Sequence, residues 1–364
     1  MINNKVVKNA SWIIGCRIAQ SVFALLINML TARYLGPSNF GVINYAASLV
    51  AFVTPIMNLG INNVLVNEII KYPEEEGKVL GTSIILTFFS SLFCIIGLTT
   101  FVSVVNVGET ETLIVCVLYS LLLISQSVEM IKFWFQAKLW SKYSSIVTLV
   151  AYIVVAIYKV WLFITEKNIY WFAVSNAFDY ILIAIALILV YKWKKGQKFV
   201  FSLTTAKRLI SQSYHYILPG MMGIVLAQSD RVMLKLMNGN ESVGLYSAAY
   251  AIAGLTTFVF TAIIDSMRPQ ILSYKKQDDF KYKKNVSRLF GIVINLSLLQ
   301  SVVVTVFAEL IIYIMYGEAY LGAISTVRII IWYTSFSYYG AVRNVWILAE
   351  EKQKYLWIIT LGGM

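Results

Sequence analysis

The sequence predicts an all-α polytopic membrane protein, and two observations carry that prediction. The chain has 364 residues, of which 59% are hydrophobic and 13% charged, and its mean hydropathy is +0.73. A soluble domain carries about a quarter charged residues. Apolar runs of about twenty residues, the length that crosses a bilayer as a helix, recur from end to end. A multi-span membrane protein follows.

The apolar runs predict ten full spans, with an eleventh starting near Tyr355. The ten lie at 11–33, 41–64, 80–105, 112–136, 143–165, 169–191, 213–236, 243–265, 289–315 and 322–348.

The loops between these runs alternate in charge. Twenty of the 30 Lys and Arg residues fall on one side, and the other side holds Arg33, Lys167 and Lys235. Because basic loops stay in the cytoplasm, we expect the N-terminus and the loops 192–212 and 266–288 to be cytoplasmic. The net charge of +12 is therefore explained by topology, and no nucleic-acid partner is expected.

The chain also repeats itself at an offset of 203 residues. LGPSNFGVINYAASL (35–49) aligns with NGNESVGLYSAAYAI (238–252), so that Gly36 matches Gly239 and Gly41 matches Gly244. Six spans separate the two copies, which gives them the same orientation, and parallel repeats are typical of two-lobed transporters. We predict a six-helix N-terminal lobe at 1–191, a basic cytoplasmic linker at 192–212 and a C-terminal lobe at 213–364. The second lobe is short by this arithmetic, so we expect the chain to be truncated relative to a functional protein.

One helical stripe interrupts the predicted second span. Its members follow steps of three and four residues, which places them on one face of a helix: Asn44, Ser48, Ala51, Pro55, Asn58 and Asn62. The residues between them are apolar enough for lipid. A single polar seam within the bilayer has to be covered by other helices or face water.

Charged groups inside spans are costly and indicate function. Arg17 and Lys159 lie well inside spans without an acidic residue three or four positions away, and Arg231 lies in the seventh span. With the polar Asn28, Asn44 and Asn58 they are our candidates for a substrate cavity. Bases of this kind bind phosphate groups, and Asn side chains bind hydroxyls, so the set suggests an anionic, hydroxyl-rich cargo.

Four further residues are candidates for coupling or gating: Asp179, Asp230, Asp265 and Arg268. Asp179 is the first choice for a titrating group if transport is linked to protons. Asp265 with Arg268, like Glu129 with Lys132, is spaced i,i+3, and each pair can equally serve only to neutralise itself. Asp230 beside Arg231 favours a structural or gating contact over a substrate ligand.

No residue pattern points to catalysis, a metal or a cofactor. His215 is the only histidine, which argues against a His-based metal site or a Ser-His-Asp triad. Cys16, Cys94 and Cys116 all lie in predicted spans, and we interpret them as small buried apolar residues without disulfides.

The paired hairpins resemble a known family. LTARYLGPSNFGVINYAASLVAFVTPIMNLGINNVLVNEI (30–69), QSDRVMLKLMNGNESVGLYSAAYAI (228–252) and RPQILSYKKQ (268–277) are similar to bacterial polysaccharide-transporter flippases of the Wzx type. These belong to the multidrug/oligosaccharidyl-lipid/polysaccharide exporter superfamily. The resemblance implies two lobes in a V in the bacterial inner membrane, which move undecaprenyl-diphosphate-linked oligosaccharide, such as an O-antigen unit, to the outer leaflet by alternating access. It also implies polysaccharide polymerase and chain-length proteins as partners.

Two other functions remain open at this point. A drug or cation antiporter of the same superfamily shares the architecture but favours acids in its cavity, whereas bases are in excess here. A membrane O-antigen polymerase or ligase is also rich in spans, but it is expected to carry a large outer loop with catalytic Arg or His residues. Every predicted outer loop here is short.

Overall fold

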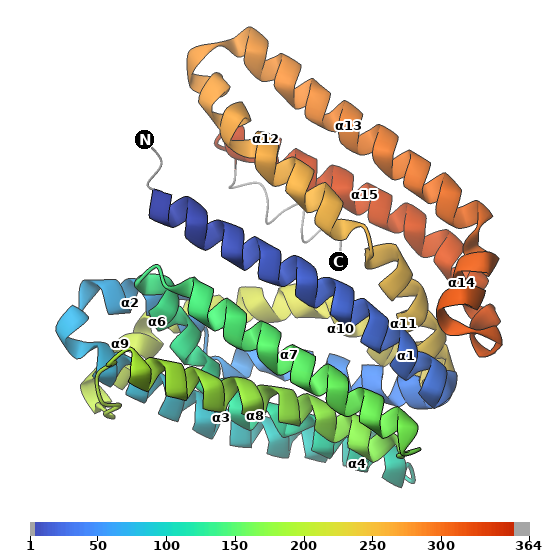
Figure 1. Ribbon diagram of the computed structural model, residues 1–364, viewed down its shortest axis with the longest axis horizontal. Coiled ribbons are helices and arrows are strands. Elements are labelled where there is room, and N and C mark those ends of the chain that lie inside the picture. Colours follow the sequence, from blue (N-terminus) through green and yellow to red (C-terminus); the bar gives the residue numbers. More distant parts are fainter. Residues whose placement is uncertain (1–3, 353–364) are drawn as a thin grey trace. The chain divides into compact units, whose positions relative to one another are not determined.

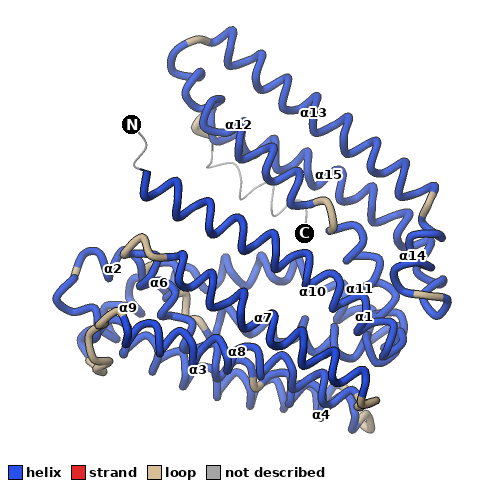
Figure 2. The backbone as a smooth tube through the Cα atoms, in the orientation of Figure 1, coloured by secondary structure: helices blue, strands red, loops and turns tan. Residues whose placement is uncertain are grey.

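The computed structural model describes residues 4–352, and the side chains of 4–14, 17, 18 and 276 are excepted. Over this range the chain forms helices and loops, with no strand (Figure 2). The helices are α1 (Asn4–Met57), α2 (Leu65–Lys71), α3 (Glu76–Val105), α4 (Thr110–Ser120), α5 (Leu122–Gln126), α6 (Ile131–Ala137), α7 (Ser141–Ile164), α8 (Ile169–Trp193), α9 (Leu203–Ser213), α10 (Ile217–Asn238), α11 (Asn240–Gly254), α12 (Thr257–Gln277), α13 (Asp279–Val306), α14 (Ala308–Tyr316) and α15 (Ile324–Ala349) (Figure 1). The predicted fold class is confirmed.

Eight stretches of the described chain are long and apolar enough to cross a membrane. Most of each predicted full span is helical; the tenth, 322–348, corresponds to α15, which is not among these eight stretches. The first two are joined in α1. They are separated where predicted, because Gly36 breaks the helical backbone with φ 71° and ψ 170°.

The predicted second span, 41–64, is wrong at its end. Helix α1 stops at Met57, and Leu59 and Gly60 then take left-handed conformations with φ 50° and 67°. A side chain at Gly60 would overlap the backbone carbonyl of Ser213. Asn58 therefore lies in a turn and Asn62 in a short 3₁₀ segment, so neither continues the polar stripe of α1.

Three other predicted spans are segmented. The run 112–136 forms α4, α5, a 3₁₀ turn and α6, while 243–265 is divided between α11 and α12, and 289–315 between α13 and α14. A single irregular turn changes neither the length nor the hydropathy of the apolar run that contains it, so these breaks were not predicted.

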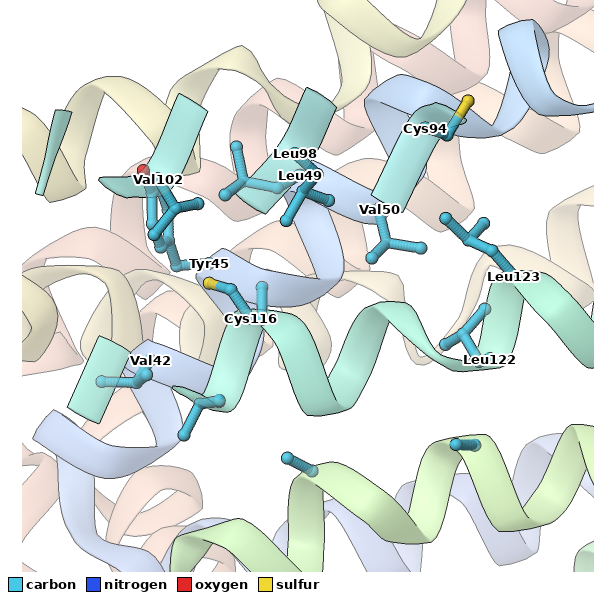
Figure 3. Close-up of a cluster of buried hydrophobic side chains, with 14 of the residues drawn as sticks. Val42, Tyr45, Leu49, Val50, Cys94, Leu98, Val102, Cys116, Leu122 and Leu123 are labelled. Atoms are coloured by element: carbon cyan, nitrogen blue, oxygen red, sulfur yellow. The ribbon is translucent and has the colours of Figure 1, made fainter. Parts of the chain in front are cut away.

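The chain forms two compact units, Met1–Gly244 and Leu245–Met364. In the first unit, α1, α3, α4 and α8 pack around a core formed by residues such as Tyr45, Leu98, Val102 and Cys116 (Figure 3). All three cysteines are buried and free, as expected. A second core of this unit is formed by Trp134 of α6 with residues such as Leu65 and Ile69 of α2.

The second unit is built on α12, α13 and α15, which pack on one another (Figure 1). Its core includes Phe260, Leu289 and Tyr338. At one end, Glu350 accepts hydrogen bonds from Lys275 at 2.7 Å and from Tyr282 at 2.8 Å. These bonds lower the pKa of Glu350. The predicted lobe boundaries, 1–191 and 213–364, describe the repeats rather than these units, and they stay a prediction.

Candidate functional site

The two repeated hairpins share an unusual backbone conformation. Gly36 has φ 71° and ψ 170°, and its repeat equivalent Gly239 has φ 84° and ψ −175°. This region of φ/ψ space is essentially restricted to glycine. The same residue type therefore makes the same turn at both copies, which is what a structural repeat requires.

The two hairpins also contact each other reciprocally. A Cβ on Gly41 would overlap the carbonyl of Asn240, and a Cβ on Gly244 would overlap the carbonyl of Pro37. Pro37 and Asn240 are repeat equivalents, as are Gly41 and Gly244. Replacing each residue by its equivalent 203 positions away exchanges one of these contacts for the other. This reciprocity is what a local two-fold arrangement produces. We call these four residues the glycine contact.

Along the same helices, a polar network joins α10 to α1. Ser48 donates a hydrogen bond to Gln228 Oε1 at 3.1 Å, and the guanidinium of Arg231 donates to the same oxygen. Asp230 accepts from the backbone N–H of Arg231 at 2.8 Å, which supports a structural role for that neighbouring pair. Gln228 is the centre of this network and was not among the predicted site residues, because a lone Gln in a span carries no distinctive pattern.

An ion pair with a buried lysine lies close to the glycine contact along α10. Lys235 of α10 donates to Glu109, in the loop before α4, at 2.6 Å, and only 3% of the lysine side chain is exposed. Thr112 also donates to this carboxylate, at 2.7 Å. Sequence analysis placed Lys235 in an outer loop, where a lysine is ordinarily solvated, so this pair was missed.

The first unit also encloses a group of charges, which we call the charged cluster: Lys159 of α7, Asp179 of α8, and the adjacent Glu129 and Lys132. Lys159 interacts electrostatically with Asp179, and so do Glu129 and Lys132. Lys132 donates a hydrogen bond to Glu129. The sequence predicted Lys159 and Asp179 separately, as a substrate ligand and a coupling group, and the structure brings them together through the packing of α7 on α8.

The negative charge of Asp179 acts on three tyrosines. Tyr119, Tyr152 and Tyr180 each interact electrostatically with Asp179. Within the described part of the chain, Asp179 Oδ1 is buried and accepts no hydrogen bond. A buried carboxylate oxygen in that condition is costly, so a hydrogen-bond donor of a ligand would be stabilising at this position.

The other predicted residues do not join this cluster. Asn44 donates to the carbonyl of Phe40 at 2.8 Å, within its own helix, and Asn28 is half-buried on α1. Arg268 and Asp265 form an exposed pair at 3.4 Å in the second unit, which agrees with mutual neutralisation. The side chain of Arg17 lies outside the described residues. Among the residues described, no group of His, Cys, Asp and Glu side chains could hold a metal ion.

Comparison with known proteins establishes the class. The sequence profile of the family described as "Polysaccharide biosynthesis protein" matches residues 6–275, so the chain belongs to this family. The search of curated proteins found no match.

Solved structures agree on the fold. An inward-facing multidrug resistance MATE transporter of the MOP superfamily aligns with a TM-score of 0.68 at 12% identity, over 94% of this chain and 83% of that one. A MOP superfamily transporter from Pyrococcus furiosus has a TM-score of 0.60 at 12% identity, over 98% and 84%. A eukaryotic MATE transporter has 0.58 at 14%, over 96% and 84%. The chain therefore has the fold of a multi-pass membrane transporter.

Proposed function

We propose that this protein is a flippase, which moves a polyprenyl-diphosphate-linked oligosaccharide from the cytoplasmic to the outer leaflet by alternating access. Membership of the polysaccharide biosynthesis family is the observation that carries the proposal. The charged cluster supports it, because it offers a cation between helices of one transporter lobe.

Lys159 is the proposed ligand of the cargo diphosphate. An ammonium group makes strong, charge-assisted hydrogen bonds to phosphate oxygens. In the absence of cargo, Asp179 provides the counter-charge for Lys159. The carboxylate and the diphosphate therefore compete for the same lysine, and protonation of Asp179 favours cargo binding, as reciprocal linkage requires.

Because of this competition, the direction in which each variant changes the binding affinity identifies the charge of the cargo. We would measure binding of undecaprenyl diphosphate to the purified protein in nanodiscs. Asp179→Asn should bind about tenfold more tightly and Lys159→Gln about tenfold more weakly, since a hydrogen bond to a charged group contributes roughly 1.5–3 kcal/mol. Asp279→Asn and Lys284→Gln, which remove the same charges from exposed positions, are the controls and should leave affinity unchanged.

A drug or cation antiporter is the second candidate function, and the buried Asp179 carboxylate favours it. Ethidium binding in the same nanodiscs separates the two functions. A cationic cargo would be bound more weakly by Asp179→Asn and more tightly by Lys159→Gln, the reverse of the flippase pattern. That reversed pattern, with no response to undecaprenyl diphosphate, would replace the flippase proposal.

Activity itself is tested in the host. Deletion of the gene should trap lipid-linked glycan on the cytoplasmic face, as read by a glycan-binding lectin on membrane vesicles of defined orientation. Lys159→Gln should not clear it. Glycan that instead reaches the outer face as single unpolymerised units would indicate a polymerase.

A further inference from the structure

The basic linker after α8 is fixed to the first unit. The N–H of Gly77 in α3 donates to Gln197 Oε1 at 2.9 Å, and the N–H of Val200 donates to the carbonyl of Gly77 at 3.2 Å. Side chains at Gly77 or Gly81 would overlap the backbone at Lys198 and Val200. These two glycines lie four residues apart on one helix face, and the backbone of the linker packs directly against them.

Helix α9 is anchored just as firmly. Its buried face consists of Thr205, Ala206, Leu209 and Ser213. Arg208 lies 2.9 Å from Glu68 and 3.2 Å from Glu75, and its guanidinium sits 4.0 Å from the ring centre of Tyr72. The linker is therefore a rigid part of the first unit, and the same side chains always form its outer surface.

That outer surface is apolar and basic. Leu203 is 63% exposed, Ile210 41% and Tyr214 53%. Steps of three and four residues place them, with the exposed Lys207, on one stripe of α9 and its continuation. A helix with an apolar stripe beside lysines and polar residues is suited to the plane of a membrane surface.

The exposed charges of the linker have one sign. Residues 192–212 contain six Lys and Arg residues and no Asp or Glu. Arg208 forms ion pairs with Glu68 and Glu75. The exposed lysines of the linker are Lys192, Lys195, Lys198 and Lys207.

An aromatic anchor at the start of the linker supports a position at the interface. Lys194 donates to the hydroxyl of Tyr143 at 2.9 Å and lies 4.3 Å from the ring centre of Trp193. Trp193 is itself 68% exposed. Tryptophan and tyrosine gather at the level of the lipid headgroups, so the linker emerges at that depth.

We propose that the linker face, defined as Lys195, Lys198, Lys207, Leu203, Ile210 and Tyr214, binds anionic phospholipid headgroups of the adjoining leaflet. The apolar stripe enters the boundary between headgroups and acyl chains, and the lysines bind lipid phosphate. Clusters of lysine beside a span attract anionic lipids in this way. The occupant is the lipid rather than a protein, because the surface continues directly from membrane-spanning helices on both sides.

The test uses the full chain in phosphatidylcholine vesicles with spin-labelled phosphatidylglycerol as the probe. The protein should bind phosphatidylglycerol in preference to spin-labelled phosphatidylcholine. A triple variant, Lys195→Gln with Lys198→Gln and Lys207→Gln, should lose most of that preference. The matched control removes three exposed lysines elsewhere, as Lys281→Gln, Lys283→Gln and Lys284→Gln, and should keep the preference.

A second measurement locates the stripe. Ile210→Cys, made with Cys16, Cys94 and Cys116 replaced by Ala and labelled with a nitroxide, should be more accessible to oxygen than to an aqueous nickel chelate. Equal loss of lipid preference in both triple variants would show that the preference depends on the net charge of the protein and not on the linker face. That result, a nitroxide exposed to bulk water, or displacement of the lipid by free glycerol phosphate would each overturn the proposal.

Discussion

The pair between Lys235 and Glu109 leaves a lysine with 3% exposure dependent on one carboxylate. Removing one partner of a buried pair costs about 3–5 kcal/mol, but 42% of the Glu109 side chain is exposed, so water will screen part of the loss. We expect Glu109→Gln to destabilise the protein by about 1–2 kcal/mol. Thermal unfolding in detergent measures this. The neighbouring Glu111→Gln removes an exposed carboxylate and should have no effect; an equal loss there would show that loop charge alone is responsible.

The same pair predicts a pH dependence. Partial burial raises the pKa of Glu109, but the hydrogen bonds from Lys235 and Thr112 outweigh it and bring the pKa below its ordinary value of 4.5. A carboxyl whose folded-state pKa is lowered contributes stability above its unfolded pKa and loses it as the pH falls through the folded value. The unfolding temperatures of the parent and Glu109→Gln should therefore differ at neutral pH and converge in acid, as the pH falls from 4.5 through the lowered pKa of the folded state. A gap that persists in acid would mean that charge is not the cause.

At this scale the sequence predicted residues better than it predicted their partners. Lys159 and Asp179 were singled out because each lies inside a span without an opposite charge three or four residues away. Their interaction crosses from α7 to α8, and helix periodicity has no information about which faces meet. Lys235 was counted by loop position alone, and only the fold shows that it is buried.

At the scale of the element, the glycine contact gives the sharpest prediction. Gly41→Ala should destabilise the protein by about 1–3 kcal/mol, the usual cost of overpacking, because the added methyl group overlaps the Asn240 carbonyl. Gly244→Ala should do the same through Pro37. Gly97→Ala is the control, since nothing lies within 4 Å of a Cβ there, and it should be neutral or slightly stabilising. The measurement is the unfolding temperature of each of the three variants.

The double variant distinguishes one contact from two. If Gly41 and Gly244 belong to a single reciprocal contact, separation of the hairpins by the first methyl group relieves the second. The effects of Gly41→Ala and Gly244→Ala should then sum to more than the effect of the double variant. Strict additivity would mean that the two glycines act independently.

Element boundaries show where sequence patterns fail. The turn at Gly36 was predicted, because Leu-Gly-Pro is a strong local signal. The end of α1 at Met57 was not, because Leu59 and Gly60 turn against the backbone of Ser213, which is distant in sequence. The docking of the linker depends on Gly77 and Gly81, which look like ordinary small residues at the start of a span.

At the scale of the whole molecule, the repeat connects sequence, fold and mechanism. Gly36 and Gly239 share one backbone conformation, and the glycine contact is reciprocal under the same offset. Sequence comparison detected the repeat from composition and spacing, but it could not show that the two copies touch. We propose that the two repeats close and separate at the glycine contact during alternating access.

That role can be tested by linking the two hairpins. Ser38 and Glu241 are repeat equivalents, are both exposed, and directly follow Pro37 and Asn240 of the glycine contact. In a background free of the three buried cysteines, Ser38→Cys with Glu241→Cys should be joined by a short cleavable bis-thiol reagent. If the hairpins separate during each cycle, the linked protein will stop clearing lipid-linked glycan from the cytoplasmic face, and reduction will restore activity. Each single-cysteine variant, treated with the same reagent, should remain active. Full activity of the linked protein would mean that the glycine contact stays closed throughout transport and that access alternates elsewhere.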